Sequence, residues 1–136
     1  MSDTQSGTEY LFAYGTLQPG RTPEEVADLV RRFESVGKGT VGGTLYDLGS
    51  YPGAVLDDTS PHRISGTVFS LPASDDVLSR LDHYEGFDPQ APKASLFIRR
   101  LHPVKLDGGV TLRCWIYEYN GALDRARIIE SGEFCK

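Results

Sequence analysis

Glu85 is the residue of this sequence whose type and position best suit acid–base chemistry. In a helix over residues 75–85, it would lie within about 40° of Leu78 and Leu81, on their apolar stripe. It would also lie in the last helical turn, where the helix dipole disfavours a negative charge. Burial and the dipole would both raise the pKa of its carboxyl group. Glu85 is therefore a candidate general acid or base, unless the helix frays and the side chain points to water.

The segment Tyr14-Gly15-Thr16-Leu17 is a second candidate site. It continues an apolar, aromatic-rich run over residues 10–14, which predicts a buried strand that stops at Gly15. The N–H groups that follow such a stop have no partners in the sheet, so they can bind a carboxylate or a developing oxyanion. Strands ending in glycine turns are common, and taken alone the segment more often has a purely structural role.

Other motifs lack the context that their chemistry requires. Residues 37–42 spell G-x-G-x-x-G, but they follow a predicted helix and precede a predicted strand, the reverse of a dinucleotide site. Cys114 alternates with apolar residues of a predicted strand, so we expect a buried, inert thiol. The histidines are far apart in the chain, and no metal site is expected; they are His62, His83 and His102.

Length and charge exclude several classes of protein. The 136 residues fit one domain, and we expect a flexible N-terminal tail over residues 1–9 and a single domain over residues 10–136. The 14 Lys and Arg against 19 Asp and Glu give a net charge of −5, which argues against a nucleic-acid partner. No apolar run approaches the ~20 residues of a membrane-spanning helix, so no membrane association is expected. The first nine residues lack a signal-peptide pattern, which predicts a cytoplasmic protein.

Two helices must position the candidate residues. Thr22, Pro23 and Glu25 form a capping box for a helix whose apolar face continues to Phe33. Ser74 can cap the second helix, residues 75–85, and Gly86 is placed to end it. The other acids of that helix, Asp75 and Asp82, are expected to be solvated.

The remaining segments predict short strands, many of them rich in glycine. The order of strand, helix, strands, helix, strands differs from the regular alternation of a doubly wound sheet. It predicts an α+β fold, a curled, mostly antiparallel sheet or small β-barrel flanked by two α-helices. Residues 126–134 are ambiguous between a short strand and a turn. The predicted strands cover residues 10–14, 64–71, 97–106 and 110–119, and Asp107-Gly108-Gly109 predicts a hairpin between the last two. Residues 36–48 are a glycine-rich segment that leads into a strand around Thr44-Leu45-Tyr46, and residues 51–56 are a turn followed by a short strand.

Several segments resemble the gamma-glutamylcyclotransferase-like family. Residues 12–17 are similar to its opening Tyr-Gly-Ser/Thr-Leu signature, and residues 81–86 to its Leu-Asp-x-x-Glu-Gly segment. The resemblance runs from Tyr10 to Phe134, with the motifs in the family's order. Further likeness to its middle strands, its aromatic strand and its Ser-Gly-Asp-Trp ending lies at residues 43–48, 51–55, 114–120 and 129–134.

The resemblance implies a small mixed, mostly antiparallel barrel and the release of 5-oxoproline from a small gamma-glutamyl substrate, without a cofactor. It implies Glu85 as the catalytic residue and Tyr14, Gly15, Thr16 and Leu17 as the substrate-binding loop.

One departure concerns substrate binding. Members often carry a Tyr just before an Arg pair, where this chain has Phe97 and Ile98. The alternative function is a ligand-binding or regulatory module that keeps the pocket without turnover. The amide's leaving group and the oligomeric state stay open.

Overall fold

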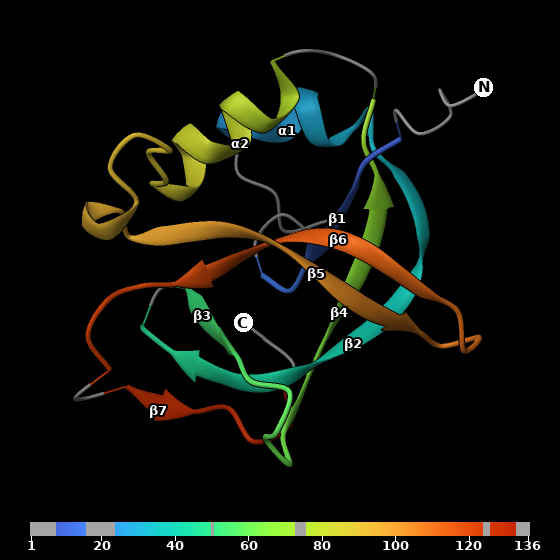
Figure 1. Cartoon of the computed structure of the whole chain (residues 1–136). Helices are drawn as coiled ribbons and strands as arrows, with labels where there is room; N and C mark the ends of the chain where they lie inside the picture. The colour runs from blue at the N-terminus through green and yellow to red at the C-terminus, as the bar shows by residue number, and fades with distance from the viewer. Residues whose placement is uncertain (1–7, 16–23, 50, 73–75, 124–125, 133–136) are drawn as a thin grey trace.

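The structure, a computed structural model, describes residues 8–15, 24–49, 51–72, 76–123 and 126–132. Two helices lie together against a strongly curved sheet (Figure 1). In chain order the elements are β1 (Tyr10–Ala13), α1 (Glu24–Val30), β2 (Glu34–Asp47), β3 (Pro52–Leu56), β4 (Arg63–Ser70), α2 (Val77–Glu85), β5 (Phe97–Leu106), β6 (Thr111–Tyr119) and β7 (Arg127–Ile128).

Five of the strands close into a barrel. β1, β4, β2, β5 and β6 are joined in that order by antiparallel ladders. A parallel contact between Leu11 and Trp115 then joins β6 to β1 and completes the closure. β3 pairs with β2 and β6, and β7 forms a short antiparallel ladder with β2. The predicted fold, a mixed and mostly antiparallel barrel flanked by two helices, is confirmed.

Successive side chains of each strand point to opposite faces of the sheet, and this divides the buried core into two clusters. In β6, Cys114 and Ile116 point into the barrel, whereas Trp115 and Tyr117 point towards the helices. The interior cluster takes at least one side chain from each of β1 to β6. The second cluster lies between the barrel and the helices, and it includes Leu81 of α2. The same strand therefore supplies both the barrel interior and the surface on which α2 is seated.

The two helices end differently from each other. The first was expected to continue to Phe33, but α1 ends at Val30 and is followed by tight turns, such as Phe33 N–H to Val30 C=O at 3.0 Å. α2 ends as predicted at Gly86, whose φ of 77° is a left-handed conformation that suits glycine. The predicted caps Thr22, Pro23 and Ser74 lie outside the described residues.

The glycine-rich segment at residues 37–42 lies within β2 and pairs with β4, after a β-bulge between Ser35 and Gly37. The segment was expected to precede a strand, whereas the structure places it within one. The ambiguous stretch after residue 126 contains β7, which pairs with β2 at Tyr46 and Asp47. Within the described ranges, none of the helices is long and apolar enough to cross a membrane.

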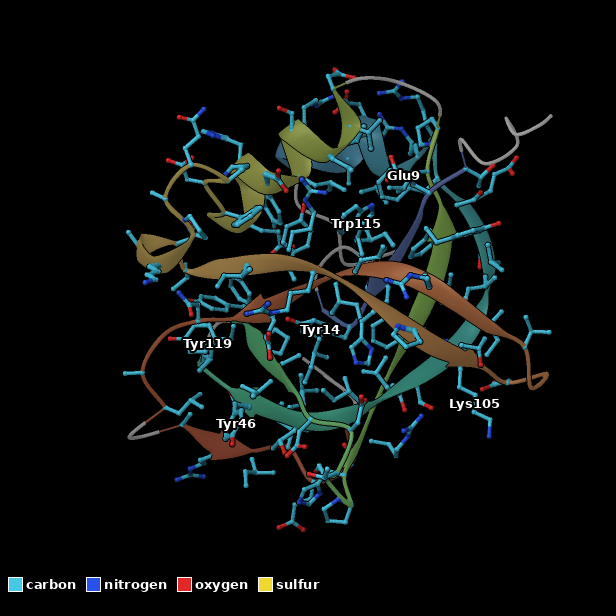
Figure 2. The ribbon with its side chains drawn as sticks, viewed as in Figure 1. Glu9, Tyr14, Tyr46, Lys105, Trp115 and Tyr119 are labelled. Atoms are coloured by element: carbon cyan, nitrogen blue, oxygen red, sulfur yellow. The ribbon has the colours of Figure 1, made fainter. Side chains whose placement is uncertain are left out.

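Most of the predicted N-terminal tail, residues 1–7, lies outside the described residues. Its last residue, Glu9, accepts a hydrogen bond from the Leu71 N–H at 2.9 Å through its carbonyl and one from Trp115 Nε1 at 2.7 Å through its carboxylate. Figure 2 shows Glu9 to the right of the helices and Trp115 close to it, below them.

Candidate active site

Glu85 is the last residue of α2, immediately before the turn that ends the helix. The N–H of Phe87 returns to the Asp82 carbonyl at 2.9 Å, and the chain then leaves the helix axis. The Glu85 side chain is partly buried, and burial raises the pKa of its carboxyl group to about 7. Among the described residues, no hydrogen bond or ion pair holds this carboxyl group. Burial is thus the cause of the raised pKa, in agreement with the apolar stripe of the sequence.

Two tyrosines from the barrel lie near Glu85. The pKa of the Tyr14 phenol is raised mainly by burial and, to a smaller extent, by the negative charge of Glu85. Burial, the acceptor Asp82 and the charge of Glu85 likewise raise the pKa of Tyr117. The end of α2, the end of β1 and the middle of β6 thus meet at one place, although they are far apart in the sequence.

The Tyr14 side chain is part of the barrel. Figure 2 shows it in the middle of the molecule, and it is 6% exposed. Its hydroxyl donates a hydrogen bond to the carbonyl of Tyr117 and accepts one from the Ala54 N–H at 3.3 Å. The hydroxyl of Tyr14 therefore links the end of β1 to β6 and β3, and substrate binding by Tyr14 stays a prediction.

Gly15 follows Tyr14 and passes close to β3. A Cβ atom at Gly15 would lie 3.0 Å from Cγ of Pro52, closer than such atoms normally approach. The absence of a side chain therefore allows the end of β1 to lie against the start of β3. The other two predicted substrate-binding residues, Thr16 and Leu17, lie outside the described residues.

Asp82 was expected to be solvated, and this expectation is wrong. Asp82 is 5% exposed and receives two hydrogen bonds from Arg99, Nε to Oδ1 at 2.8 Å and Nη2 to Oδ2 at 3.2 Å. The Tyr117 hydroxyl donates a third, to Oδ1, at 2.7 Å. The guanidinium of Arg99 also lies over the Trp115 ring, 4.4 Å from its centroid. A buried carboxylate is tolerated here because it is fully paired.

The burial of Asp82 has a signal in the sequence. Asp82 lies four residues after Leu78. In a helix this spacing puts the two side chains within about 40° of each other, so Asp82 shares the apolar stripe. Its partners have no such local signal. Arg99 and Tyr117 face each other across the β5–β6 ladder, and only that register brings both to Asp82.

Phe97 lies where members of the resembled family often carry a tyrosine. It is 5% exposed and packs against two other rings, with centroids 6.0 Å from Tyr51 and 5.4 Å from Tyr119. Ile98 is partly buried. Phe97 therefore provides apolar packing at this position and no hydroxyl group.

A shallow pocket of about 280 Å³ lies beside the end of α2 and the following loop. Glu85 does not line it. Its walls are Asp82, His83, Gly86, Phe87, Asp88, Ala91, Ala94 and Ser95. Within the described ranges, no three His, Cys, Asp or Glu side chains gather closely enough to hold a metal ion.

Cys114 lies inside the barrel and is fully buried. Burial raises the pKa of its thiol to about 12, so almost none of it is the reactive thiolate at neutral pH. The prediction of a buried, inert thiol is confirmed.

The pKa of Glu85 predicts a cost in stability. A carboxyl group with a pKa of about 7 stabilises the folded state while protonated, and that contribution is lost as the pH rises through 7. Glu85→Gln cannot ionise, so we expect it to raise the free energy of unfolding by about 3 kcal/mol at pH 8, the cost of a pKa raised from 4.5 to about 7. The gain should shrink as the pH falls towards 4.5, the ordinary value for a glutamate. Urea unfolding at several pH values measures it, with the exposed Glu130→Gln as control; equal behaviour of the two variants would contradict the prediction.

The model of the GGACT family, described as gamma-glutamyl cyclotransferase, AIG2-like, matches residues 11–136. The chain belongs to this family. No curated protein matches the chain.

Solved structures share the GGACT-family fold. YkqA from Bacillus subtilis has 22% identity and a TM-score of 0.67 over 93% of this chain, which spans 39% of the length of YkqA. An aig2-like protein from Mus musculus has 20% identity and a TM-score of 0.66 over 85% of this chain and 80% of its own. The protein ytfP from Escherichia coli has 24% identity and a TM-score of 0.63 over 92% and 95% of the two chains. At these identities the likeness shows the fold alone.

Proposed function

We propose that this chain is a gamma-glutamyl cyclotransferase that releases 5-oxoproline and a free amine from a small gamma-glutamyl amide. In this reaction the α-amino group of the glutamyl unit attacks its own γ-carbonyl carbon. The new C–N bond closes a five-membered lactam, and the bond to the leaving amine breaks. Both reacting groups belong to one molecule, so holding that molecule in a folded conformation contributes much of the rate enhancement.

Glu85 is the proposed general acid and base. The α-ammonium group must lose a proton before its nitrogen can attack, and the Glu85 carboxylate takes that proton. The leaving amine must gain a proton as its bond breaks, and the protonated Glu85 returns it. A carboxyl group with a pKa of about 7 suits both steps, because both of its forms are populated near neutral pH.

The observation that carries the proposal is the position of Glu85. Within the described part of the chain, this partly buried carboxyl group has no hydrogen-bond or ion-pair partner, and its charge acts on the Tyr14 phenol at the end of β1. A carboxylate in such a position costs stability, which favours a role in chemistry over one in folding. The backbone N–H groups of Gly15, Thr16 and Leu17 are the proposed donors to the substrate's carboxylate or to the oxyanion.

The test is the release of 5-oxoproline from a panel of gamma-glutamyl amines, amino acids and peptides. A matched compound with an acetylated α-amino group serves as the control, because it lacks the attacking nitrogen. We expect 5-oxoproline from at least one free amine substrate and nothing from its acetylated partner. Release of glutamate from the free amine substrate and of N-acetylglutamate from its acetylated partner would identify an amide hydrolase and contradict the proposal.

A second candidate function is a ligand-binding module without turnover. Phe97 favours it, because a ring without a hydroxyl stands where family members often carry a tyrosine. A binding module would be stabilised against heating by 5-oxoproline or a gamma-glutamyl compound and would leave that compound intact. The cytoplasmic location and the absence of a nucleic-acid partner stay predictions.

A further inference from the structure

α2 is held on the barrel by two kinds of contact. Val77 and Leu81 bury apolar side chains against the barrel surface. Such contacts are strong but weakly directional, and they tolerate small rotations of a helix about its axis. Asp82 adds three hydrogen bonds from two different strands, and these fix both a distance and an angle.

The strand partners of Asp82 are themselves rigidly placed. Arg99 of β5 and Tyr117 of β6 are directly opposite in the ladder and present their side chains on the same face. The guanidinium of Arg99 is flanked by two rings, 4.4 Å from the Trp115 centroid and 5.8 Å from that of Phe87. The backbone carbonyl of Tyr117 also accepts the hydrogen bond of the Tyr14 phenol. The network therefore joins α2, β5 and β6 to the end of β1.

Glu85 lies three residues after Asp82, so any rotation of α2 about its axis moves both side chains together. The charge of Glu85 acts on two phenols of the barrel, those of Tyr14 at the end of β1 and Tyr117 of β6. Arg99 of β5 and Asp82 of α2 form an ion pair, and Asp82 also accepts the hydrogen bond of the Tyr117 hydroxyl. A displacement of about 1 Å at a reacting group is enough to reduce a rate by ~10²-fold.

We propose that Asp82, Arg99 and Tyr117 are positioning residues that fix the orientation of α2 and so hold Glu85 at the end of β1. The inference rests on the proposed function, because it assigns these residues to the same reaction. These three residues do not touch the substrate. They act through Glu85, by keeping its carboxyl group shielded and aimed.

The same helix offers a matched control. Arg80 pairs with Asp28 of α1 at 3.1 Å, with side chains 35% and 60% exposed. Arg80→Lys weakens an ion pair of α2 that is not part of the network. A general loosening of α2 would follow from a substitution in the network or from Arg80→Lys. A rotation that moves Glu85 would follow only from a substitution in the network.

The test compares Tyr117→Phe and Arg99→Lys with Arg80→Lys. Tyr117→Phe keeps the ring and removes one hydroxyl, and Arg99→Lys keeps the charge but loses the two-point contact. The first measurement is the pKa of Glu85 from its carboxyl ¹³C shift, which needs no turnover. We expect it to fall by about one pH unit in both network variants, because the carboxyl group becomes more solvated, and to stay unchanged in Arg80→Lys.

The second measurement is steady-state release of 5-oxoproline. We expect kcat to fall by ~10- to 100-fold in the network variants with KM nearly constant. The double variant should lose little more than the worse single one, because both changes act through Asp82. A lowered melting temperature with an unchanged Glu85 titration would overturn the proposal. If the wild type releases no 5-oxoproline, the proposed function fails, and the Glu85 titration still decides whether the network positions Glu85.

Discussion

Glu85→Gln is expected to lower kcat for 5-oxoproline release by about 10²- to 10⁴-fold, the usual contribution of a general acid–base group. Gln has nearly the same shape as Glu, but its amide neither accepts the ammonium proton nor returns it to the leaving amine. The burial of Glu85 and its pKa of about 7 make it the group best matched to that transfer among the residues described. KM should change little, because the substitution removes an interaction made mainly in the transition state.

The control for this loss is Glu130→Gln. Glu130 is exposed, so the same substitution there changes the net charge equally without entering the site. Wild-type kcat is expected in that variant. Full activity in Glu85→Gln would remove Glu85 from the reaction, whatever the control shows.

Arg99→Met is expected to lower the free energy of unfolding by about 3 kcal/mol, because it leaves the buried Asp82 carboxylate without its charge partner. Met keeps a long apolar side chain, so most of the packing against the Trp115 ring is retained. The loss therefore reports the unpaired charge and not a cavity. Urea unfolding at neutral pH measures it.

Arg80→Met provides the comparison for Arg99→Met. Its partner Asp28 is solvent-exposed, so water replaces the lost ion pair and the free energy of unfolding should hardly change. If both substitutions had equal effects, the Asp82–Arg99 pair would be no more important to the fold than a surface contact.

Patterns that depend on neighbouring residues were predicted correctly. The end of α2 at Gly86 follows from one glycine after an apolar helix face. The β5–β6 hairpin follows from two alternating runs joined by Asp107-Gly108-Gly109. The burial of Glu85 follows from its spacing to Leu78 and Leu81, because helix geometry is the same wherever the helix lies.

Features that depend on distant residues were not predicted. The pairing of Asp82 with Arg99 and Tyr117 needs the register of two strands and the seating of a helix across them. The capture of the Tyr14 phenol inside the barrel needs the parallel contact between β1 and β6. A barrel was expected from the order of the elements and the family resemblance, but the strand pairings that close it were not.

Local spacing thus predicted most of the elements, the C-terminal end of α2 and the place of the Glu85 carboxyl group on its apolar stripe, because each depends on the geometry of a few consecutive residues. The start of α2 was predicted at residue 75, whereas the helix begins at Val77 after the N-cap residue Asp76. The barrel's closure specified which side chains surround that carboxyl group. Hydrogen bonds between distant strands form only when the whole sheet is assembled, and the sequence carries no nearby record of them.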